Sequence, residues 1–416
     1  MGTQKALKEI KRRFSLTPYT RLMWVVLLFL EIYSLLPLPS SHVPLPKPAV
    51  HPAFQSGVIH VHSIFSDGGG TIPEIATAAK SAGIDFVVVT DHNDSGARRH
   101  GFEKNYSGVD VFVEMEASAP AGHLLAFYSH TGAKDLDDKT INQLAWKHYL
   151  REDSRPGMFT VVAHPSNIKN PWTHLDKFPD GMEIINFDSI WQQQASDALL
   201  NFAATVLIMP WNNYLAALRF FEPNPKDLVA WDAMNSVTPG HFGILAHDTH
   251  AKLKFAPGNS IRFPDYLSTF RLASNVVFAP SPLPIDFAER KKLIYEALRL
   301  GKAAMIFQSI YPYAGNDWRL ECGDKVYRVG DTTPFGSKGC AFTVETPHGL
   351  PYTHLIRLWR NGELAGEVVS TRQIEQLPIE RPGMYRAEVW VKAHSLMFLA
   401  LHRPTPYVFY NPIYVR

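Results

Sequence analysis

The sequence has only two cysteines in 416 residues, Cys322 and Cys340. Two thiols are too few for a zinc site built from cysteines, so a site of that kind is excluded. An oxidising compartment would let them form a disulfide. Two free buried thiols are equally consistent with the sequence, because it does not place their Cβ atoms within bonding distance.

Net charge is also small, formally +2 from 41 basic and 39 acidic residues. The first 21 residues hold six basic residues against one glutamate, or +5, so the rest of the chain carries −3. A weakly negative body has no long-range field that would gather phosphate backbones. Nucleic acid is therefore not expected as a partner.

The motifs of several catalytic classes are missing. The chain has no Gly-x-Ser-x-Gly nucleophile elbow, no Walker loop and no Rossmann glycine fingerprint. The run Gly68-Gly-Gly70 is expected to be a turn and not a nucleotide loop. These absences speak against a serine hydrolase of the elbow type, a P-loop enzyme and a dinucleotide-dependent enzyme.

The N-terminus has the pattern of an export signal. Basic residues 1–21 precede an apolar run at 22–38, and a proline-rich linker follows at 39–55. The run is short for a spanning helix, which needs roughly 20 residues, but tilt can accommodate it. We expect an exported protein on the periplasmic or extracytoplasmic face, held by a retained anchor. Cleavage of the segment, and a buried or interfacial helix, stay open.

The chain is too long for one ordinary domain, because cores stop growing near about 250 to 300 residues. Between residues 56 and 312, apolar strands alternate with helical stretches, which predicts parallel crossovers and an α/β barrel of TIM-like type. From 313 to 416, short alternating strands separated by glycine and proline predict a small antiparallel β-sandwich of immunoglobulin-like type.

Histidines and carboxylates stand at the ends of the predicted barrel strands. His60 and His62 are two apart on one strand, so both point to the same face, and Asp67 follows in a glycine turn. An isolated His-x-His is more often a surface pair. Here, however, later strand ends supply further candidates, namely His92, Glu116, His123, His164, Asp248 and His250. Because barrels place working residues at strand ends, the repetition predicts a metal centre.

Two neighbouring residues complicate this set. Glu114 competes with Glu116, since residues two apart on a strand share a face. His247 competes with His250 and is interpreted as a packing or supporting residue. Both alternatives depend on which side chains converge in the folded chain.

The motifs together resemble the polymerase and histidinol phosphatase (PHP) family of metal-dependent phosphoesterases. The resemblance covers about Val58 to Gln308 and rests on His60-Val-His62, Ser66-Asp-Gly68, Thr90-Asp-His-Asn93, Glu116-Ala-Ser118, Gly122-His123, Ala163-His-Pro165 and Asp248-Thr-His250. The N-terminal segment and the C-terminal strands resemble the exported carbaryl-hydrolase-like branch. The family resemblance implies a distorted seven-stranded β/α barrel and favours Glu116 over Glu114.

The resemblance also implies how the ligands divide among two or three divalent ions. One ion would lie near His60, His62, Glu116 and Asp248. Glu116 would bridge to a second ion held by His123 and His164. A third would lie on Asp67, His92 and His250. Zinc, manganese and iron all suit these ligands, and the sequence does not choose among them.

The expected reaction is hydrolysis by a metal-bound hydroxide, with His60, His62, Glu116 and Asp248 acting through that water. A phosphoesterase acting on a small-molecule ester is the leading hypothesis. A carboxyl ester or carbamate hydrolase of the same family is the first alternative, and a catalytically inactive metal-binding envelope protein is the second.

Substrate-binding residues are harder to read from the sequence. Arg98, Arg99 and Lys252 follow ligand motifs in predicted loops and are candidates for holding an anionic substrate. A solvated basic loop is the plainer interpretation of each. Trp172, Trp191 and Trp211 are further candidates for a pocket wall around a hydrophobic group, although core or lid packing is the plainer interpretation.

Overall fold

The computed structural model describes the chain from residue 54 to the C-terminus with gaps. The described ranges are 54–129, 136–153, 155–174, 179–197, 223–256, 259–280, 282–335, 339–350, 352–392 and 404–416, together with Met23 and Val26. The predicted anchor at 22–38 therefore lies outside the described residues, apart from those two. Among the helices described, none combines the length and apolar character needed to cross a membrane.

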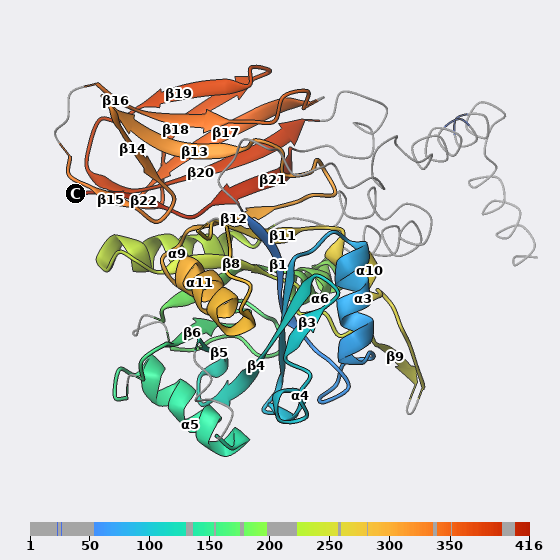
Figure 1. Cartoon of the computed structure of the whole chain (residues 1–416). Coiled ribbons are helices and arrows are strands. Elements are labelled where there is room, and N and C mark those ends of the chain that lie inside the picture. The colour runs from blue at the N-terminus through green and yellow to red at the C-terminus, as the bar shows by residue number, and fades with distance from the viewer. Residues whose placement is uncertain are drawn as a thin grey trace, which may run out of the picture.

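A mixed sheet forms the N-terminal half of the described chain (Figure 1). Its strands, in hydrogen-bonded order, are β1 (Gln55–Val61), β2 (Phe86–His92), β4 (Val109–Ala119), β5 (Gly122–Tyr128), β6 (Met158–Val162), β7 (Gly181–Asn186) and β8 (Phe242–Ala246). These are the strands that the apolar runs predict.

The strand directions differ from the predicted pattern at β5. β1, β2 and β4 are mutually parallel, and so are β6, β7 and β8. β5 is antiparallel to both of its neighbours. The cause is local, because a tight turn from Ala119 to Gly122 makes β4 and β5 a hairpin. This turn leaves the start of β5 beside the end of β4.

The segment after β8 returns to β1. The His247 N–H donates to the Ile59 carbonyl and the His62 N–H to the Thr249 carbonyl, both at 3.0 Å. On the side away from β2, β1 pairs with antiparallel β11 (Ser274–Val277), so the sheet does not end at β1. The fold is mixed α/β and rich in sheet, and the closed seven-stranded barrel stays a prediction.

Helices and short strands connect the main strands. They are α3 (Ile72–Ser81), α4 (Gly96–Arg99), β3 (Lys104–Tyr106), α5 (Asp138–Tyr149), α6 (Phe187–Asp197), α9 (Pro225–Val237), β9 (Leu253–Ala256), β10 (Asn259–Ile261), α10 (Tyr266–Phe270) and α11 (Phe287–Arg299). α3 shows why the sequence signals worked. Thr71 and Glu74 form a capping box, and Pro73 lies in the first turn.

Alternate residues of the strands belong to two separate cores. One face packs against α3 and holds Val87, Val89, Val111 and Val113. The opposite face packs against α11 and holds Phe86, Val88, Phe112, Leu125, Phe127, Phe159 and Val161. Following this second face by steps of two residues leads to His92 on β2, Glu116 on β4 and His123 on β5. The predicted ligands therefore continue the α11-side core at one end of the strands.

The C-terminal part consists of strands. They are β12 (Ala303–Ile306), β13 (Asp317–Cys322), β14 (Lys325–Arg328), β15 (Thr332–Thr333), β16 (Cys340–Glu345), β17 (Thr353–Arg360), β18 (Glu363–Ser370), β19 (Ile374–Pro378), β20 (Gly383–Lys392), β21 (Thr405–Tyr410) and β22 (Ile413–Val415). β14, β13, β16 and β19 form one sheet, and β17 to β22 without β19 join the large sheet. The two pack together, with the rings of Phe342 and Tyr385 4.7 Å apart.

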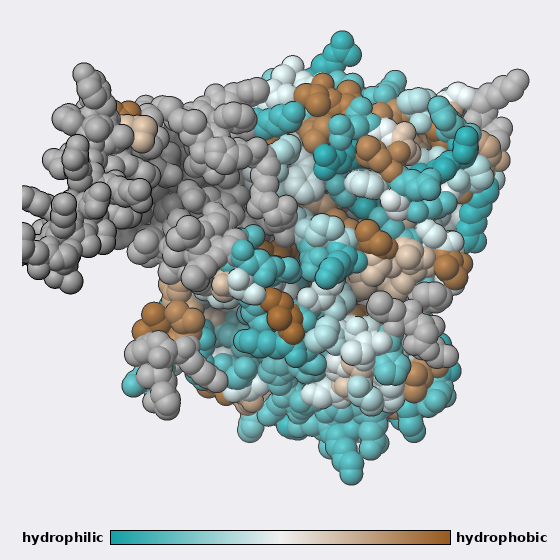
Figure 2. Space-filling model, turned by 180° about the vertical axis from the view of Figure 1, so that it is seen from behind, coloured by the Kyte–Doolittle hydropathy of each residue, from teal (hydrophilic) through white to brown (hydrophobic). Residues whose placement is uncertain are grey.

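The pairing of β12 with β21 crosses the predicted domain boundary between residues 312 and 313. Ala304 lies opposite Tyr410, so the large sheet runs without a break from the N-terminal part into the C-terminal strands. In Figure 1 these strands, in orange and red, lie above the helices α9 and α11. Figure 2 shows the opposite side of the molecule. There the surface of the C-terminal strands mixes hydrophilic and hydrophobic residues, whereas the lower part of the molecule is mostly hydrophilic.

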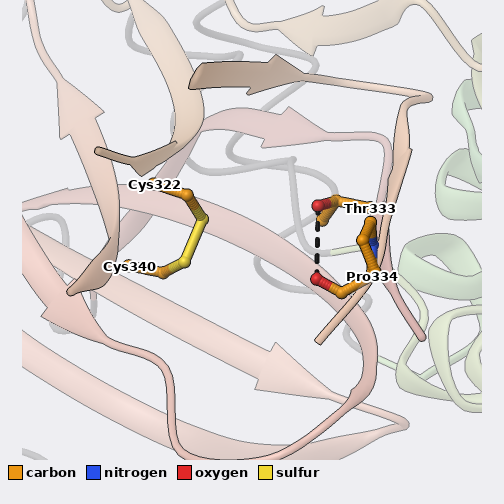
Figure 3. The surroundings of a disulfide bond; sticks show 4 residues. All are labelled: Cys322, Thr333, Pro334 and Cys340. Carbon is orange, nitrogen blue, oxygen red and sulfur yellow. Dashed lines mark hydrogen bonds between the residues drawn. A yellow bond between two sulfur atoms is a disulfide. The ribbon is translucent and has the colours of Figure 1, made fainter. Parts of the chain in front are cut away.

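Cys322 and Cys340 form a disulfide (Figure 3). The two residues lie directly opposite each other on antiparallel β13 and β16. The disulfide therefore links adjacent strands of the smaller sheet, and of the two arrangements that the sequence left open the structure has the paired one.

Candidate metal centre

His60 and His62 are fully buried at the end of β1 and begin the site. The pairing of β1 with β2 shifts register between Ile59 and Val61, so a bulge falls at His60. His60 has φ 66°, in the left-handed region that a residue with a side chain avoids. The centroids of the two imidazole rings lie 5.0 Å apart. The bulge re-aims these histidines toward the strand ends.

Two further candidate ligands share this strained backbone. His164, after β6, has φ 31°, and Asp248, after β8, has φ 47°. Such conformations cost on the order of 1 to 3 kcal/mol each and persist where the surroundings impose them, often at functional sites. Three of the predicted ligands are thus held in conformations that the chain alone would not adopt.

Asp67 lies on a loop of glycines that fits closely under the site. A Cβ at Gly68 would lie 2.3 Å from the His62 carbonyl oxygen, and one at Gly69 would lie 2.4 Å from the Ala251 carbonyl oxygen. Only glycine allows the loop to approach this closely. The predicted glycine turn therefore lets the loop that carries Asp67 lie close to the ends of the strands.

The first predicted ligand group is assembled around His60 and His62. The Nε2 atom of His60 lies 3.0 Å from Glu116 Oε2 and 3.5 Å from Asp248 Oδ1. The Nε2 atom of His62 lies 3.3 Å from each of the same two oxygens. Two imidazole nitrogens and two carboxylate oxygens therefore face one small space.

The second group uses the other oxygen of Glu116. Its Oε1 lies 2.6 Å from His123 Nδ1 and 2.9 Å from His164 Nε2. The two oxygens of one fully buried carboxylate thus face two different sets of histidines. This is the geometry that the resemblance implies for a bridging residue.

The third group is the most exposed. Asp67 Oδ1 lies 3.3 Å from His250 Nε2, 3.9 Å from His92 Nε2 and 3.7 Å from His62 Nδ1. His92 Nδ1 also lies 3.0 Å from Glu116 Oε2. His62 and His92 therefore belong to two groups each, which the sequence did not indicate. All nine predicted ligands are brought together.

The charges and unpaired atoms of the site fit divalent cations. Within the part of the chain that the structure describes, the ion pairs of the site carboxylates Asp67, Glu116, Glu183 and Asp248 are with histidines alone. Both ring nitrogens of His62 and Oδ1 of Asp67 are buried with no hydrogen-bond partner among the described residues. Buried carboxylates and unpaired imidazole nitrogens are costly unless they are paired or coordinate a metal.

The pKa values of His62 and Glu116 also suit the binding of divalent cations. Burial, together with the charge of His250, lowers the pKa of His62 to about 4, so His62 is the neutral imidazole that a metal needs. Burial would raise the pKa of Glu116, but the surrounding histidines outweigh it and hold the pKa well below its usual value. Glu116 is therefore a carboxylate at neutral pH.

Sequence reasoning missed Glu183, which lies in the middle of β7. Its Oε1 lies 2.6 Å from His60 Nδ1, and its Oε2 accepts hydrogen bonds from the His164 N–H at 2.6 Å and from Asn186 at 2.7 Å. The signal was present, because Gly181-Met-Glu-Ile-Ile-Asn186 is a strand of buried residues interrupted by one carboxylate. A lone charge in such a strand needs a partner.

The two open alternatives are now separated. Glu114 does not face the histidines and instead pairs with Arg98 and Lys291, both at 2.7 Å. His247 does not join the ligands, because its Nε2–H donates to the Ala273 carbonyl at 3.0 Å. Burial lowers the pKa of His247 to about 3, so it is a neutral packing residue.

Of the three predicted substrate-binding residues, only Lys252 lies at the pocket. A cavity of about 770 Å³ opens from the ligands and is lined by Lys252, Lys169 and α6. Arg98 is buried beside Glu114 and Glu103. Arg99 pairs with Asp138 at 2.6 Å, outside the cavity. These arginines do not line the cavity because both point to carboxylates of neighbouring elements.

No family model matches the chain, and no curated protein matches it. The solved structures that are similar to it include the following two. One is a two-domain protein of Bacteroides vulgatus containing a predicted PHP-like metal-dependent phosphoesterase, with 14% identity, 89% of this chain and 99% of that chain covered, and a TM-score of 0.37. The other is a predicted metal-dependent phosphoesterase of Bifidobacterium adolescentis, with 14% identity, 52% and 96% covered, and a TM-score of 0.27. The carbaryl-hydrolase-like branch stays a prediction.

Proposed function

We propose that the protein is a multinuclear metal-dependent hydrolase of ester bonds, with phosphoesters as the favoured substrates. The observation that carries the proposal is the position of Glu116. One oxygen faces His123 and His164, and the other faces His60. A carboxylate shared by two histidine sets suits two cations that act on one substrate.

The chain's own residues prepare the site for this chemistry. When bound, the ions would activate a water molecule and neutralise charge that develops on the substrate oxygens. Glu183 fixes the ring of His60, and the burial of His60 and Glu116 keeps bulk water away from the ligands. Lys252 adds a positive charge to the cavity wall for an anionic substrate.

A metal analysis combined with activity measurements tests the proposal. We expect at least two ions per chain, and turnover of p-nitrophenyl phosphate that depends on added zinc, manganese or iron. His60→Ala and Asp248→Ala should abolish turnover, whereas His348→Ala, a matched change at an exposed position, should not. Full activity in the protein stripped of metal would refute the proposal.

A carboxyl ester or carbamate hydrolase is the second candidate. The observation in its favour is the shortage of cations, since no arginine is among the described residues that line the cavity. Arginine is the side chain that best matches phosphate. Turnover of p-nitrophenyl acetate without turnover of p-nitrophenyl phosphate would select this candidate. Bound metal without turnover of either would select a binding protein of the envelope.

We also propose that the protein is exported and anchored by residues 22–38. The basic residues before this segment favour a cytoplasmic N-terminus and an exported C-terminal part. The Cys322–Cys340 disulfide suits an oxidising compartment. Fusion of a periplasm-dependent reporter to the C-terminus tests the location. An inactive reporter fusion that accumulates in the cytoplasm would refute it.

A further inference from the structure

One face of α6 forms a wall of the cavity that holds the ligands. The lining residues of this helix follow two rows with a spacing of four. One row is apolar and consists of Phe187, Trp191 and Ala195. The other is polar and consists of Asp188, Gln192 and Ser196. Because residues four apart lie on the same side of a helix, both rows face the cavity together.

The apolar row continues onto the segment between β10 and α10. The rings of Trp191 and Phe263 have centroids 6.3 Å apart and an interplanar angle of 66°, so they form an aromatic corner. Pro264, Leu253 and Leu272 line the cavity beside it. These residues make a continuous apolar surface that starts next to the ligands, because Phe187 packs on His247 with centroids 5.0 Å apart.

The polar row adds no positive charge. Asp188 accepts a hydrogen bond from Gln192 one turn later. The Oε1 atom of Gln192 is buried and has no hydrogen-bond partner among the described residues. A carboxylate in this wall repels a second anionic group of a substrate that lies next to α6. The wall therefore suits a group that is uncharged.

We infer that the substrate is an ester with an uncharged, apolar group of aryl or medium-chain alkyl size, held against Phe187, Trp191 and Phe263 while the ester bond lies at the ligands. This rests on the proposed hydrolase function and narrows its substrate class. Small polar phosphoesters, such as short sugar phosphates, would leave this apolar wall in water.

A homologous series of substrates tests the inference. Ethyl, butyl and hexyl phosphate differ little in the acidity of the leaving alcohol, and the p-nitrophenyl esters of acetate, butyrate and hexanoate share one leaving group. For whichever series is turned over, kcat/KM should rise with chain length, by up to about fourfold for each CH2 that becomes buried. We expect at least a tenfold rise from the first to the last member.

Variants of the apolar row test whether this row causes the dependence of kcat/KM on chain length. Trp191→Ala should lower kcat/KM for the longest substrate about tenfold and change the shortest less than about twofold. Trp390→Ala removes the same side chain from β20, outside the cavity, and should leave the chain-length dependence intact. Ala195→Asp provides a second test that removes no packing, and it should penalise only the long substrates.

Binding separates the inference from the proposed function. Hexylphosphonate and ethylphosphonate resist hydrolysis, and calorimetry on the metal-loaded protein should show tighter binding of the hexyl compound in the wild type but not in Trp191→Ala. Hydrolysis without chain-length dependence would overturn the inference and leave the function. Chain-length-dependent binding without hydrolysis would overturn the function and leave the inference, and equal binding of both compounds would overturn the inference.

Discussion

The carboxylate of Glu183 lies 2.6 Å from Nδ1 of His60, and both side chains are fully buried. When Nδ1 donates to Glu183, a neutral His60 would offer its Nε2 lone pair to a cation beside Glu116 and Asp248. Glu183 also accepts from the His164 backbone N–H. One carboxylate on β7 therefore orients ligands from β1 and from the end of β6, as supporting carboxylates do in metal sites.

Glu183→Gln should weaken metal binding by about 10- to 100-fold, because glutamine keeps the hydrogen bond to His60 but removes the negative charge that makes the imidazole a stronger ligand. Titration of the metal-free protein, followed by calorimetry or by recovered activity, measures this. Turnover should return at high metal concentration. Glu74→Gln, at the exposed start of α3, is the control and should bind metal as the wild type does. Unchanged affinity in Glu183→Gln would refute the orienting role.

Glu114 and Glu116 provide a matched pair of substitutions on one strand. Glu116→Gln should abolish the binding of at least one ion, with the fold retained. Glu114→Gln should keep the metal but lower the free energy of unfolding by about 3 to 5 kcal/mol, because Arg98 and Lys291 lose their buried partner. Metal analysis and denaturant unfolding distinguish the two outcomes. The reverse pattern would show that the ligand is Glu114.

The Cys322–Cys340 disulfide should stabilise the C-terminal strands without affecting the metal centre. The cysteines are 18 residues apart, and a loop of that length corresponds to about 3 kcal/mol. The double substitution of both cysteines by serine should therefore lower the Tm by several degrees, while metal content and kcat/KM stay within about twofold. A reductant should lower the Tm of the wild type only. Equal Tm values for both proteins would contradict this prediction.

Asp180 should make stability depend on pH in the acid range. Burial would raise the pKa of its carboxyl group, but hydrogen bonds from His148 and the Thr160 N–H and the charge of Arg151 outweigh it and lower the pKa to about 2. A pKa that is lower in the folded state contributes stability above about pH 4, and this contribution is lost as the pH falls toward 2. It amounts to about 2 kcal/mol.

Asp180→Asn tests that contribution. Denaturant unfolding of metal-free wild type and variant should differ by about 2 kcal/mol at pH 7 and should converge as the pH approaches 2. Chelator in every sample removes the separate effect of metal release at low pH. A constant difference from pH 7 to pH 2 would show that Asp180 acts by packing alone.

Much of the site could be predicted because its signals are local. Strand alternation placed His60 and His62 on one face, the ends of the apolar runs indicated His92 and Glu116, and the glycine turn placed Asp67 nearby. Glu183 was missed, since a single carboxylate in an apolar strand does not reveal its partner 123 residues away. Arg98 is a similar case, because its ion pair with Glu114 depends on how α4 packs on β4, which the sequence does not show.

The sequence by itself determined the strands, the ligand types and their order along the chain, because side-chain alternation and turn chemistry act between near neighbours. Only the tertiary structure decided which residues converge. The strained backbone of His60 and the choice of Glu116 over Glu114 both depend on packing between distant segments. The pairing of Cys322 with Cys340 likewise required the register of β13 against β16, which is set by contacts that no local pattern encodes.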